Sequence, residues 1–200
     1  MVAAGDADGM VTGVTRSYSA ILNDVRQVMN VRPGQRPIGV SLIFSKGRVV
    51  FVADTNVHEM PTAEELADIT VQAAGVARRF GHEPRVAMLS FSNFGSNAHP
   101  FSQKVSRAVE IIKYRAPSLV VDGEMQADTA LAPEISKASF PFNRVPGNAN
   151  VLVFPDLQSG NIAYKLLQRI GGAELIGPLL TGLSRPVHVL QRGSEVNDIV

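Results

Sequence analysis

The chain has 200 residues, of which 45% are hydrophobic and 18% are charged, and its formal net charge is +1 at pH 7. These values predict a folded domain with a real core and argue against a disordered tail or a nucleic-acid-binding surface. The absence of cysteine excludes disulfides, thiolate catalysis and cysteine-ligated metals.

No apolar stretch is long enough to predict a transmembrane helix. The N-terminal residues also lack the basic and apolar pattern of a signal peptide. We therefore expect a cytoplasmic protein with no membrane partner.

The first predicted elements come before residue 55. The GDADG stretch at 5–9 has two carboxylates but lacks the further ligands of a calcium loop, so we interpret it as a tight turn. Apolar spacing predicts a helix over residues 14–29. Its inward residues would be Ile21, Val25 and Val28. Residues 38–44 and 48–53 predict two strands of a hairpin.

A second helix is marked by a clear start signal. Thr62 begins a TAEE capping box with Glu65, and Gly81 suits the position just after the helix. The apolar residues at helical spacing are Leu66, Ile69, Ala73, Val76, Ala77 and Phe80. A short buried strand over 85–89 follows, and then an amphipathic helix carrying Val105, Ala108, Val109 and Ile112.

The remaining elements continue the alternation of strands and helices. Residues 118–121 and 151–154 predict strands, and the irregular stretch 132–149 has room for a helix over 133–138. A helix over 161–170 is predicted to pack on the sheet through one stripe. That stripe would be Ala163, Leu166, Leu167 and Ile170. This order indicates an α/β fold with a mostly parallel sheet and an antiparallel hairpin.

Small polar residues gather where three predicted strands end. They are Ser90, Ser92, Asn93, Gly95 and Ser96 after 85–89; Asp122, Gly123, Glu124 and Gln126 after 118–121; and Ser159, Gly160 and Asn161 after 151–154. Ligands of open parallel sheets bind at the carboxyl ends of the strands, so we expect these loops to approach one cleft together with 192–198. The free N–H groups of the helix after 151–154 would suit an anion. Ordinary turns and helix caps explain any single loop better than a ligand does, and they explain the three loops together about as well.

Other chemistry has less support. The four histidines show no metal-binding spacing, and the sequence contains no GxGxxG, Walker A or GxSxG motif. We therefore predict no metal site in this chain.

Several stretches, in order, resemble the phosphate acetyl/butyryltransferases. They include GDADGMVTG, VAMLSFSNFGS, DGEMQADTAL, VLVFPDLQSGNIAYKLLQRIGG and GPLLTGLSRPVHVLQRGS. The same stretches also resemble the phosphotransacetylase-like C-terminal domain of bacterial multidomain NADP-dependent malic enzymes. The resemblance implies a three-layer α/β/α fold in which residues 1–175 form the second subdomain. Residues 176–200 would return to a first subdomain that lies upstream, so the sequence would be a fragment of a longer chain.

The departures from the family pattern affect its expected chemistry. The terminal Ser-Arg-Gly motif of the active transferases reads Gln191-Arg192-Gly193 here, and the following aspartate falls at Asp198. The resemblance implies that Arg192 holds a phosphate and that Asp198 takes the proton of the CoA thiol. The family's Ser-Thr-Lys-Gly-Ser loop reads SNFGS at 92–96, which replaces a cation by Phe94.

The resemblance leaves three hypotheses open. The first is a regulatory domain that binds acetyl-CoA or another acyl-CoA and controls a malic enzyme domain, where NADP and Mg²⁺ or Mn²⁺ would bind. The second is a working phosphate acyltransferase, and the third is a structural dimerisation domain. We expect a homo-oligomer. We also expect that Lys165 and Arg192 bind the ligand together with residues of the three loops. A solvated lysine and a structural ion pair are the alternatives for these two residues.

Overall fold

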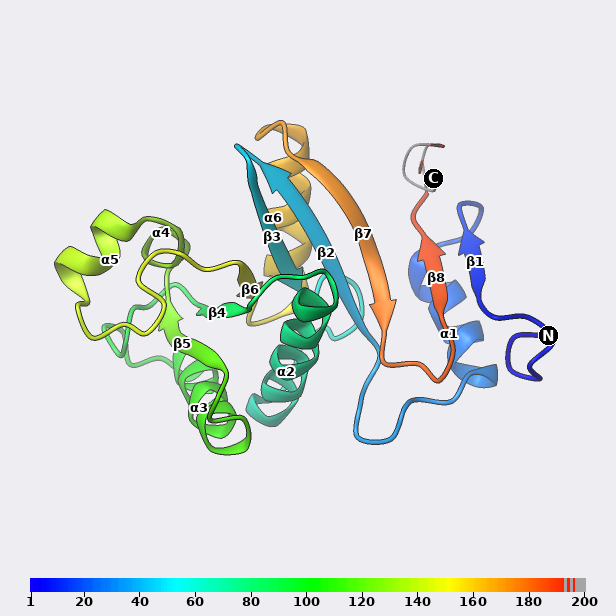
Figure 1. Cartoon of the computed structure of the whole chain (residues 1–200), viewed down its shortest axis with the longest axis horizontal. Helices are drawn as coiled ribbons and strands as arrows, with labels where there is room; N and C mark the ends of the chain where they lie inside the picture. The colour runs from blue at the N-terminus through cyan, green and yellow to red at the C-terminus, as the bar shows by residue number, and fades with distance from the viewer. Residues whose placement is uncertain (193, 195, 197–200) are drawn as a thin grey trace.

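The computed structural model describes residues 1–192, Ser194 and Val196, and its strands form two separate sheets (Figure 1). The strands are β1 (Met10–Gly13), β2 (Ile38–Ser45), β3 (Arg48–Ala53), β4 (Arg85–Leu89), β5 (Val120–Met125), β6 (Val151–Val153), β7 (Glu174–Thr181) and β8 (Val187–Leu190). The helices are α1 (Tyr18–Val28), α2 (Ala63–Arg79), α3 (Pro100–Arg115), α4 (Ala127–Leu131), α5 (Pro133–Ser139) and α6 (Leu157–Arg169).

The larger sheet has six strands in the order β5-β4-β6-β3-β2-β7. β3, β4, β5 and β6 pair in parallel, whereas β2 is antiparallel to both of its neighbours, β3 and β7. The predicted hairpin is therefore confirmed, with Val40 opposite Ala53. Helices cover both faces of the sheet, so the three-layer α/β/α prediction is also confirmed.

Alternate strand residues divide the core into two layers, because successive side chains of a strand point to opposite faces. Phe51, Val86 and Met88 pack with α2 and α3 in the largest apolar cluster. On the other face, Val52 packs with Tyr164 of α6. The clusters beneath α4 and α6 complete that second layer.

α2 matches its predicted start and end closely. The Thr62 hydroxyl accepts a bond from the Glu65 N–H, and the Glu65 carboxylate accepts one from the Thr62 N–H, which completes the capping box. Gly81 follows the helix at a φ of +79°, the left-handed conformation expected at this position. Local signals therefore define this helix without help from the rest of the chain.

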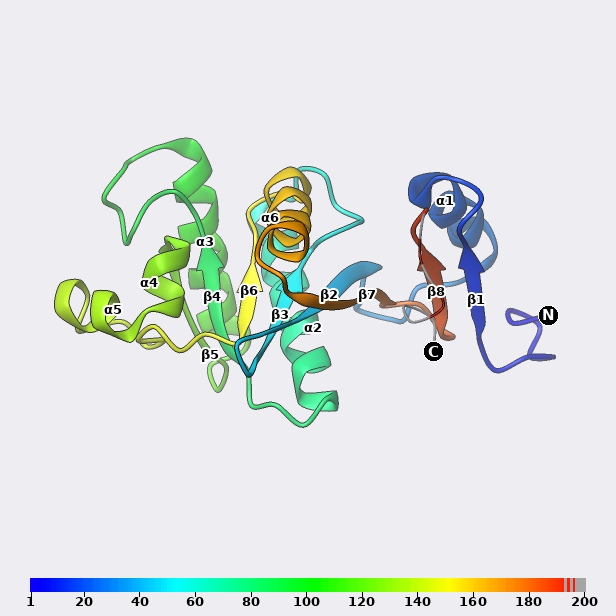
Figure 2. The ribbon, with the colours of Figure 1, turned by 90° about the horizontal axis from the view of Figure 1, so that it is seen from above.

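A smaller unit lies beside the six-stranded sheet in both ribbon views (Figures 1 and 2). It consists of α1 and a parallel pair of strands, β1 and β8, neither of which the sequence predicted. α1 begins at Tyr18 instead of residue 14, because the Ser17 hydroxyl caps the N–H of Ala20. Ile21 and Val25 are buried as predicted, but Val28 is 65% exposed, so its predicted inward position is wrong.

The stripe predicted for α6 is wrong. The helix begins at Leu157, four residues earlier than predicted, and the Ser-Gly-Asn turn therefore lies in its first turns. Its buried residues are Gly160 and Tyr164, whereas Leu166, Leu167 and Ile170 are exposed. The Tyr164 ring fills the space above Val52 and Ile43, and this contact sets which side of the helix faces the sheet.

β5 and the segment after it also differ from prediction. β5 continues to Met125, so Asp122, Gly123 and Glu124 lie inside the strand rather than in a loop after it. The helix predicted over 133–138 is present as α5, and α4 precedes it unpredicted.

None of the described helices is long and apolar enough to cross a membrane. The division of the chain at residue 175 stays a prediction.

Candidate functional site

Four loops meet at one edge of the six-stranded sheet. β5, β4, β6 and β3 are neighbours in that order and run in parallel, so their carboxyl ends point the same way. The sequence predicted polar loops after β4 and β6 and polar residues near the end of β5. It missed the loop after β3, residues 54–58.

The loop after β4 is organised around a buried carboxylate. Glu124, 2% exposed, accepts hydrogen bonds at Oε1 from the Ser92 hydroxyl at 3.0 Å and from the Gly95 N–H at 2.6 Å. The Ser96 hydroxyl accepts a bond from the Asn93 N–H. The Asn93 side chain donates to Gln126 Oε1 and accepts from the Gln126 backbone N–H. The polar groups that we predicted to bind a ligand thus form hydrogen bonds with one another in this structure.

Phe94 belongs to an aromatic cluster. Its ring centroid lies 5.1 Å from that of Phe140 and 5.0 Å from that of Phe142. Edge and tilted contacts of this kind are favourable for aromatic pairs. Phe94, at the position where the resemblance implies a cation, therefore stabilises the packing of the 140–142 segment.

The start of α6 is capped from within the chain. The Asp156 carboxylate accepts a 2.7 Å hydrogen bond from the Ser159 N–H, and the Ser159 hydroxyl donates to the Asp156 carbonyl oxygen. A carboxylate thus occupies the position proposed for an external anion. Ser159 and Gly160 thus belong to a capped helix start, which favours the interpretation of this turn as an ordinary helix cap over an anion site.

Lys104, which the sequence analysis missed, joins two of the loops. Its Nζ donates to the Pro155 carbonyl oxygen at 2.9 Å, so α3 contacts the start of α6. Burial lowers the pKa of Lys104, and the nearby Asp156 charge opposes that shift. A cation therefore lies at this edge although Phe94 supplies none. A lysine within an amphipathic helix gave no signal of this role.

Asp54, also missed, organises the loop after β3. It is 4% exposed, and its carboxylate accepts backbone N–H bonds from Gly39, Asn56, Val57 and His58. Burial raises the pKa of Asp54, and the backbone hydrogen bonds partly offset that effect. The carboxylate therefore fixes the conformation of residues 54–58.

The loop after β3 packs directly on α6. A Cβ atom on Gly160 would lie 2.9 Å from the Asp54 carbonyl oxygen, so a side chain at 160 would force the two apart. Asn161 adds a 3.3 Å hydrogen bond from its Nδ2 to the Thr55 carbonyl oxygen. Gly160 is thus required by close approach of backbone to backbone.

Gln191 connects the smaller unit to α6. It lies just after β8, and its Nε2 donates to the Tyr164 hydroxyl at 2.7 Å. Its Oε1 accepts from Lys165 Nζ at 3.2 Å, and that ammonium lies 5.3 Å from the Tyr164 ring centroid. The amide at the position where the resemblance implies a serine is therefore bonded at both ends.

Two polar atoms near this contact have no partner among the described residues. They are the hydroxyl of Tyr18 and Oδ1 of Asn56, both buried. Burial raises the pKa of Tyr18, and the charges of Asp54 and Tyr164 add to the effect. We call Tyr18, Asp54, Asn56, Asn161, Tyr164, Lys165 and Gln191 the junction cluster.

Most of the predicted site residues fall into two groups, while Ser159 and Gly160 form the start of α6. Ser90, Ser92, Asn93, Gly95 and Ser96 belong to the loop network around Glu124, where the Ser90 hydroxyl accepts from the Ser92 N–H. Asn161 and Lys165 belong to the junction cluster. Arg192 is exposed directly after Gln191, and Asp198 lies outside the described residues. Among the residues that the structure describes, no group of three or more His, Cys, Asp or Glu is placed to hold a metal ion.

Comparison with known proteins gives consistent matches over the whole chain. The family model described as Phosphate acetyl/butaryl transferase matches residues 1–200. An NADP-dependent malic enzyme of Rhizobium meliloti is 50% identical over 200 residues, which are 100% of this chain and 26% of that protein. A phosphate acetyltransferase of Thermoanaerobacterium thermosaccharolyticum is 44% identical over 208 residues, covering 100% of this chain and 63% of that protein.

A solved structure agrees with both matches. The crystal structure of a phosphotransacetylase from Streptococcus pyogenes has a TM-score of 0.93 and 44% sequence identity, over 99% of this chain and 61% of that one. The chain thus spans from about a quarter to less than two thirds of the length of these relatives.

Proposed function

The chain belongs to the phosphate acetyl/butaryl transferase family, and from this premise we propose that it is an acetyl-CoA-binding regulatory domain without acyl transfer activity. Its parent protein would be an NADP-dependent malic enzyme that converts malate to pyruvate and carbon dioxide. NADP and Mg²⁺ or Mn²⁺ would bind outside these 200 residues. The 50% identity to a malic enzyme supports this context.

The observation that carries the proposal is the bonding of Gln191. Where active relatives are expected to offer a serine hydroxyl, this chain has an amide whose two polar atoms contact Tyr164 and Lys165. Phe94, in the place of a second expected polar group, packs against Phe140 and Phe142. Loss of one donor to developing negative charge costs about 10²–10³ in rate. Two such losses disfavour transfer chemistry while leaving room for a ligand.

The junction cluster supports ligand binding. The Tyr18 hydroxyl and Asn56 Oδ1 are buried and unpartnered within the described chain, and such atoms are stabilised by a bound polar group. Lys165 supplies positive charge within the cluster through its contact with Gln191, and Arg192 follows Gln191 directly in the sequence. Acetyl-CoA would bias the whole protein by binding one arrangement of its parts about 5–150-fold more tightly than another, which corresponds to about 1–3 kcal/mol.

A working phosphate acetyltransferase is the second candidate. It is favoured by the sequence identity of 44% to a phosphate acetyltransferase. The phosphotransacetylase of known structure is also 44% identical in sequence. Lys104 would then replace the cation missing at Phe94. The two candidates differ in one measurable product, acetyl phosphate.

The deciding experiment uses the full-length protein. Acetyl phosphate formation from acetyl-CoA and phosphate is measured beside malate oxidation at increasing acetyl-CoA. We expect a change in malate oxidation with acetyl-CoA and at most trace acetyl phosphate. Transfer at the rate of an ordinary phosphate acetyltransferase would establish the second candidate. No response of malate oxidation would end the regulatory proposal.

Arg192→Ala tests the site. We expect a weaker response to acetyl-CoA, because a charge-assisted contact is removed. Arg107→Ala is the matched control, since Arg107 forms an exposed pair with Glu110 on α3. A variant that loses thermal stability yet keeps the full response would make Arg192 a structural residue.

A further inference from the structure

A cavity of about 290 Å³ has a lining that shares no residue with the four loops of the candidate site. Its walls are the last turn of α2, the end of β7 and the segment that leads into β8. The charged and polar residues that line it are Arg32, Arg79, Thr181, Arg185 and His188. None of these residues belongs to the junction cluster or to the network around Glu124.

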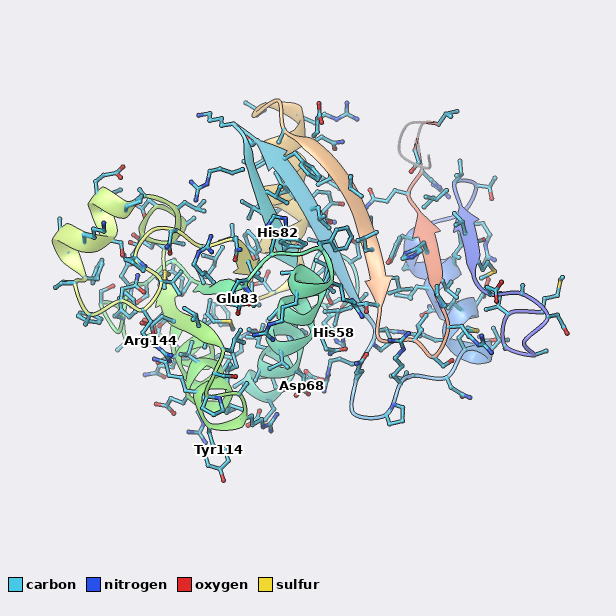
Figure 3. All side chains as sticks on the ribbon, in the orientation of Figure 1. His58, Asp68, His82, Glu83, Tyr114 and Arg144 are labelled. Carbon is cyan, nitrogen blue, oxygen red and sulfur yellow. The ribbon has the colours of Figure 1, made fainter. Side chains whose placement is uncertain are left out.

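The lining is strongly basic. Three arginines line the cavity, and no Asp or Glu of the described chain does so. Two carboxylates that Figure 3 labels, Asp68 and Glu83, pair with other cations: Asp68 with Arg36 and Arg115, and Glu83 with Arg78. Among the described residues, the three lining arginines form no ion pair.

Hydrogen bonds bring together the segments that carry these cations. The Arg32 N–H donates to the Gly182 carbonyl oxygen at 2.9 Å, and Arg79 Nη2 donates to the Thr181 hydroxyl at 3.3 Å. Gly182 has a φ of +92°, which favours glycine at the bend after β7. The arginines therefore come together from three segments that are distant in sequence.

His188 adds an unsatisfied polar atom. Its Nδ1 is buried and has no hydrogen-bond partner within the described residues. Buried polar groups are normally paired with protein, water or ligand, so this atom is a position for a further polar contact. Burial also lowers the pKa of His188, which keeps the ring neutral at pH 7.

The rest of the lining is apolar and includes an aromatic ring. Phe80 is 50% exposed at the end of α2, beside Val76, Leu179 and Leu183. Small-molecule sites combine an apolar wall with a few converging polar groups in this way, at volumes from about 300 Å³ upward. Guanidinium groups match phosphate oxygens in geometry and charge.

We propose that this cavity is a second ligand site, which binds a phosphate monoester joined to an aromatic base, as in a nucleoside monophosphate. The arginines hold the phosphate, and Phe80 with the leucines packs against the base. The site is distinct from the one proposed for acetyl-CoA and does not depend on it.

The test is calorimetric titration of the full chain with AMP, with inorganic phosphate, ribose 5-phosphate and adenosine as separate arms. We expect AMP to bind at least about tenfold more tightly than any of the three, because both halves of the ligand are recognised. No AMP binding at millimolar concentration overturns the proposal. Equal binding of inorganic phosphate or ribose 5-phosphate overturns it in favour of a bare anion site.

Variants locate the site. Arg79→Gln and Arg185→Gln should each weaken AMP binding about tenfold or more, while Arg107→Gln leaves it unchanged. All three arginines are exposed, and melting curves confirm that each variant is folded. Unchanged affinity in both cavity variants overturns the proposal.

A last arm separates this site from the proposed acetyl-CoA site, because CoA itself contains a phosphorylated adenosine. Arg192→Gln should leave AMP affinity unchanged. If it abolishes AMP binding, AMP occupies the acetyl-CoA site and the proposal fails. If acetyl-CoA does not change the rate of malate oxidation but AMP affinity still depends on Arg79, the proposed function fails and the second site stands.

Discussion

At the scale of single residues, Gln191 and Asp54 explain most of the geometry of the junction cluster. Gln191 connects the end of β8 to α6 through Tyr164 and Lys165. Asp54 gathers four backbone N–H groups into the loop that α6 packs against. The polar atoms of both side chains bond to groups of the protein. Substitutions that remove these hydrogen bonds should therefore lower the free energy of unfolding measurably.

Tyr164→Phe should destabilise the chain by about 0.5–1.5 kcal/mol, because it removes the acceptor of the Gln191 Nε2 hydrogen bond. Urea unfolding measures the change. Tyr114→Phe is the control, since Tyr114 is 88% exposed and extends from the end of α3 into solvent (Figure 3). Equal effects of the two substitutions would contradict a contribution from the Gln191 bond.

His188 should make stability depend on pH. Burial lowers the pKa of His188 below its ordinary value of 6.5, so in the window below 6.5 the unfolded chain binds the proton first. Its contribution to stability is therefore present above that window and is lost as the pH falls through it. The difference in unfolding free energy between wild type and His188→Gln, measured from pH 7.5 downward, should shrink on acidification. A constant difference would exclude His188 as the source.

At the scale of elements, α2 and α6 show what the sequence alone could predict. α2 carries its own cap at Thr62, its own stop at Gly81 and a long apolar period, all of which are local. α6 turns a different side to the sheet, because its orientation depends on Gly160 meeting the Asp54 carbonyl oxygen. That contact joins residues about a hundred positions apart and leaves no periodic signal.

The same distinction holds for the candidate site. The parallel order of the strands was enough to place the loops after β4 and β6 at one edge. Asp54 and Lys104 were missed because their roles arise from contacts with Gly39 and Pro155. Neither residue type nor spacing distinguishes them from ordinary surface charges before the strands are assembled.

Two helical glycines give a matched test of this interpretation. Gly160→Ala should destabilise the chain, because the new Cβ would lie 2.9 Å from a backbone oxygen. Gly75→Ala should stabilise it by about 0.4–1 kcal/mol, because nothing lies within 4 Å of its Cβ and alanine restricts the unfolded chain. Thermal melting of both variants gives the comparison. Shifts of the same sign would contradict the close packing of α6 on the loop after β3.

At the scale of the whole molecule, the chain has separate cores for the six-stranded sheet and for the smaller unit. The core of the smaller unit contains Leu22 and Val25 of α1 with Val187 and Val189 of β8. It is formed by the two ends of the described chain around a single pair of strands. We therefore expect the smaller unit to open more readily than the sheet.

Leu22→Ala should expose this difference. Leu22 is 3% exposed, and such a truncation costs about 2–5 kcal/mol where it is buried. Native-state hydrogen exchange should then show faster exchange of α1 amides, with β4 amides still protected. Ile112→Ala in the larger core is the comparison, and it should speed exchange in β4. Equal loss of protection in both units after Leu22→Ala would mean that they unfold together.

The contact between Gln191 and Tyr164 also has a spectroscopic consequence. The chain has no tryptophan and three tyrosines. Tyr114 is in solvent, whereas Tyr18 and Tyr164 lie at the junction between the two units. Tyrosine emission from the unmodified chain therefore reports mainly on this junction against a constant solvent background. A ligand that moves β8 relative to α6 would change the Gln191 hydrogen bond and, with it, the intrinsic fluorescence, so no attached dye is needed.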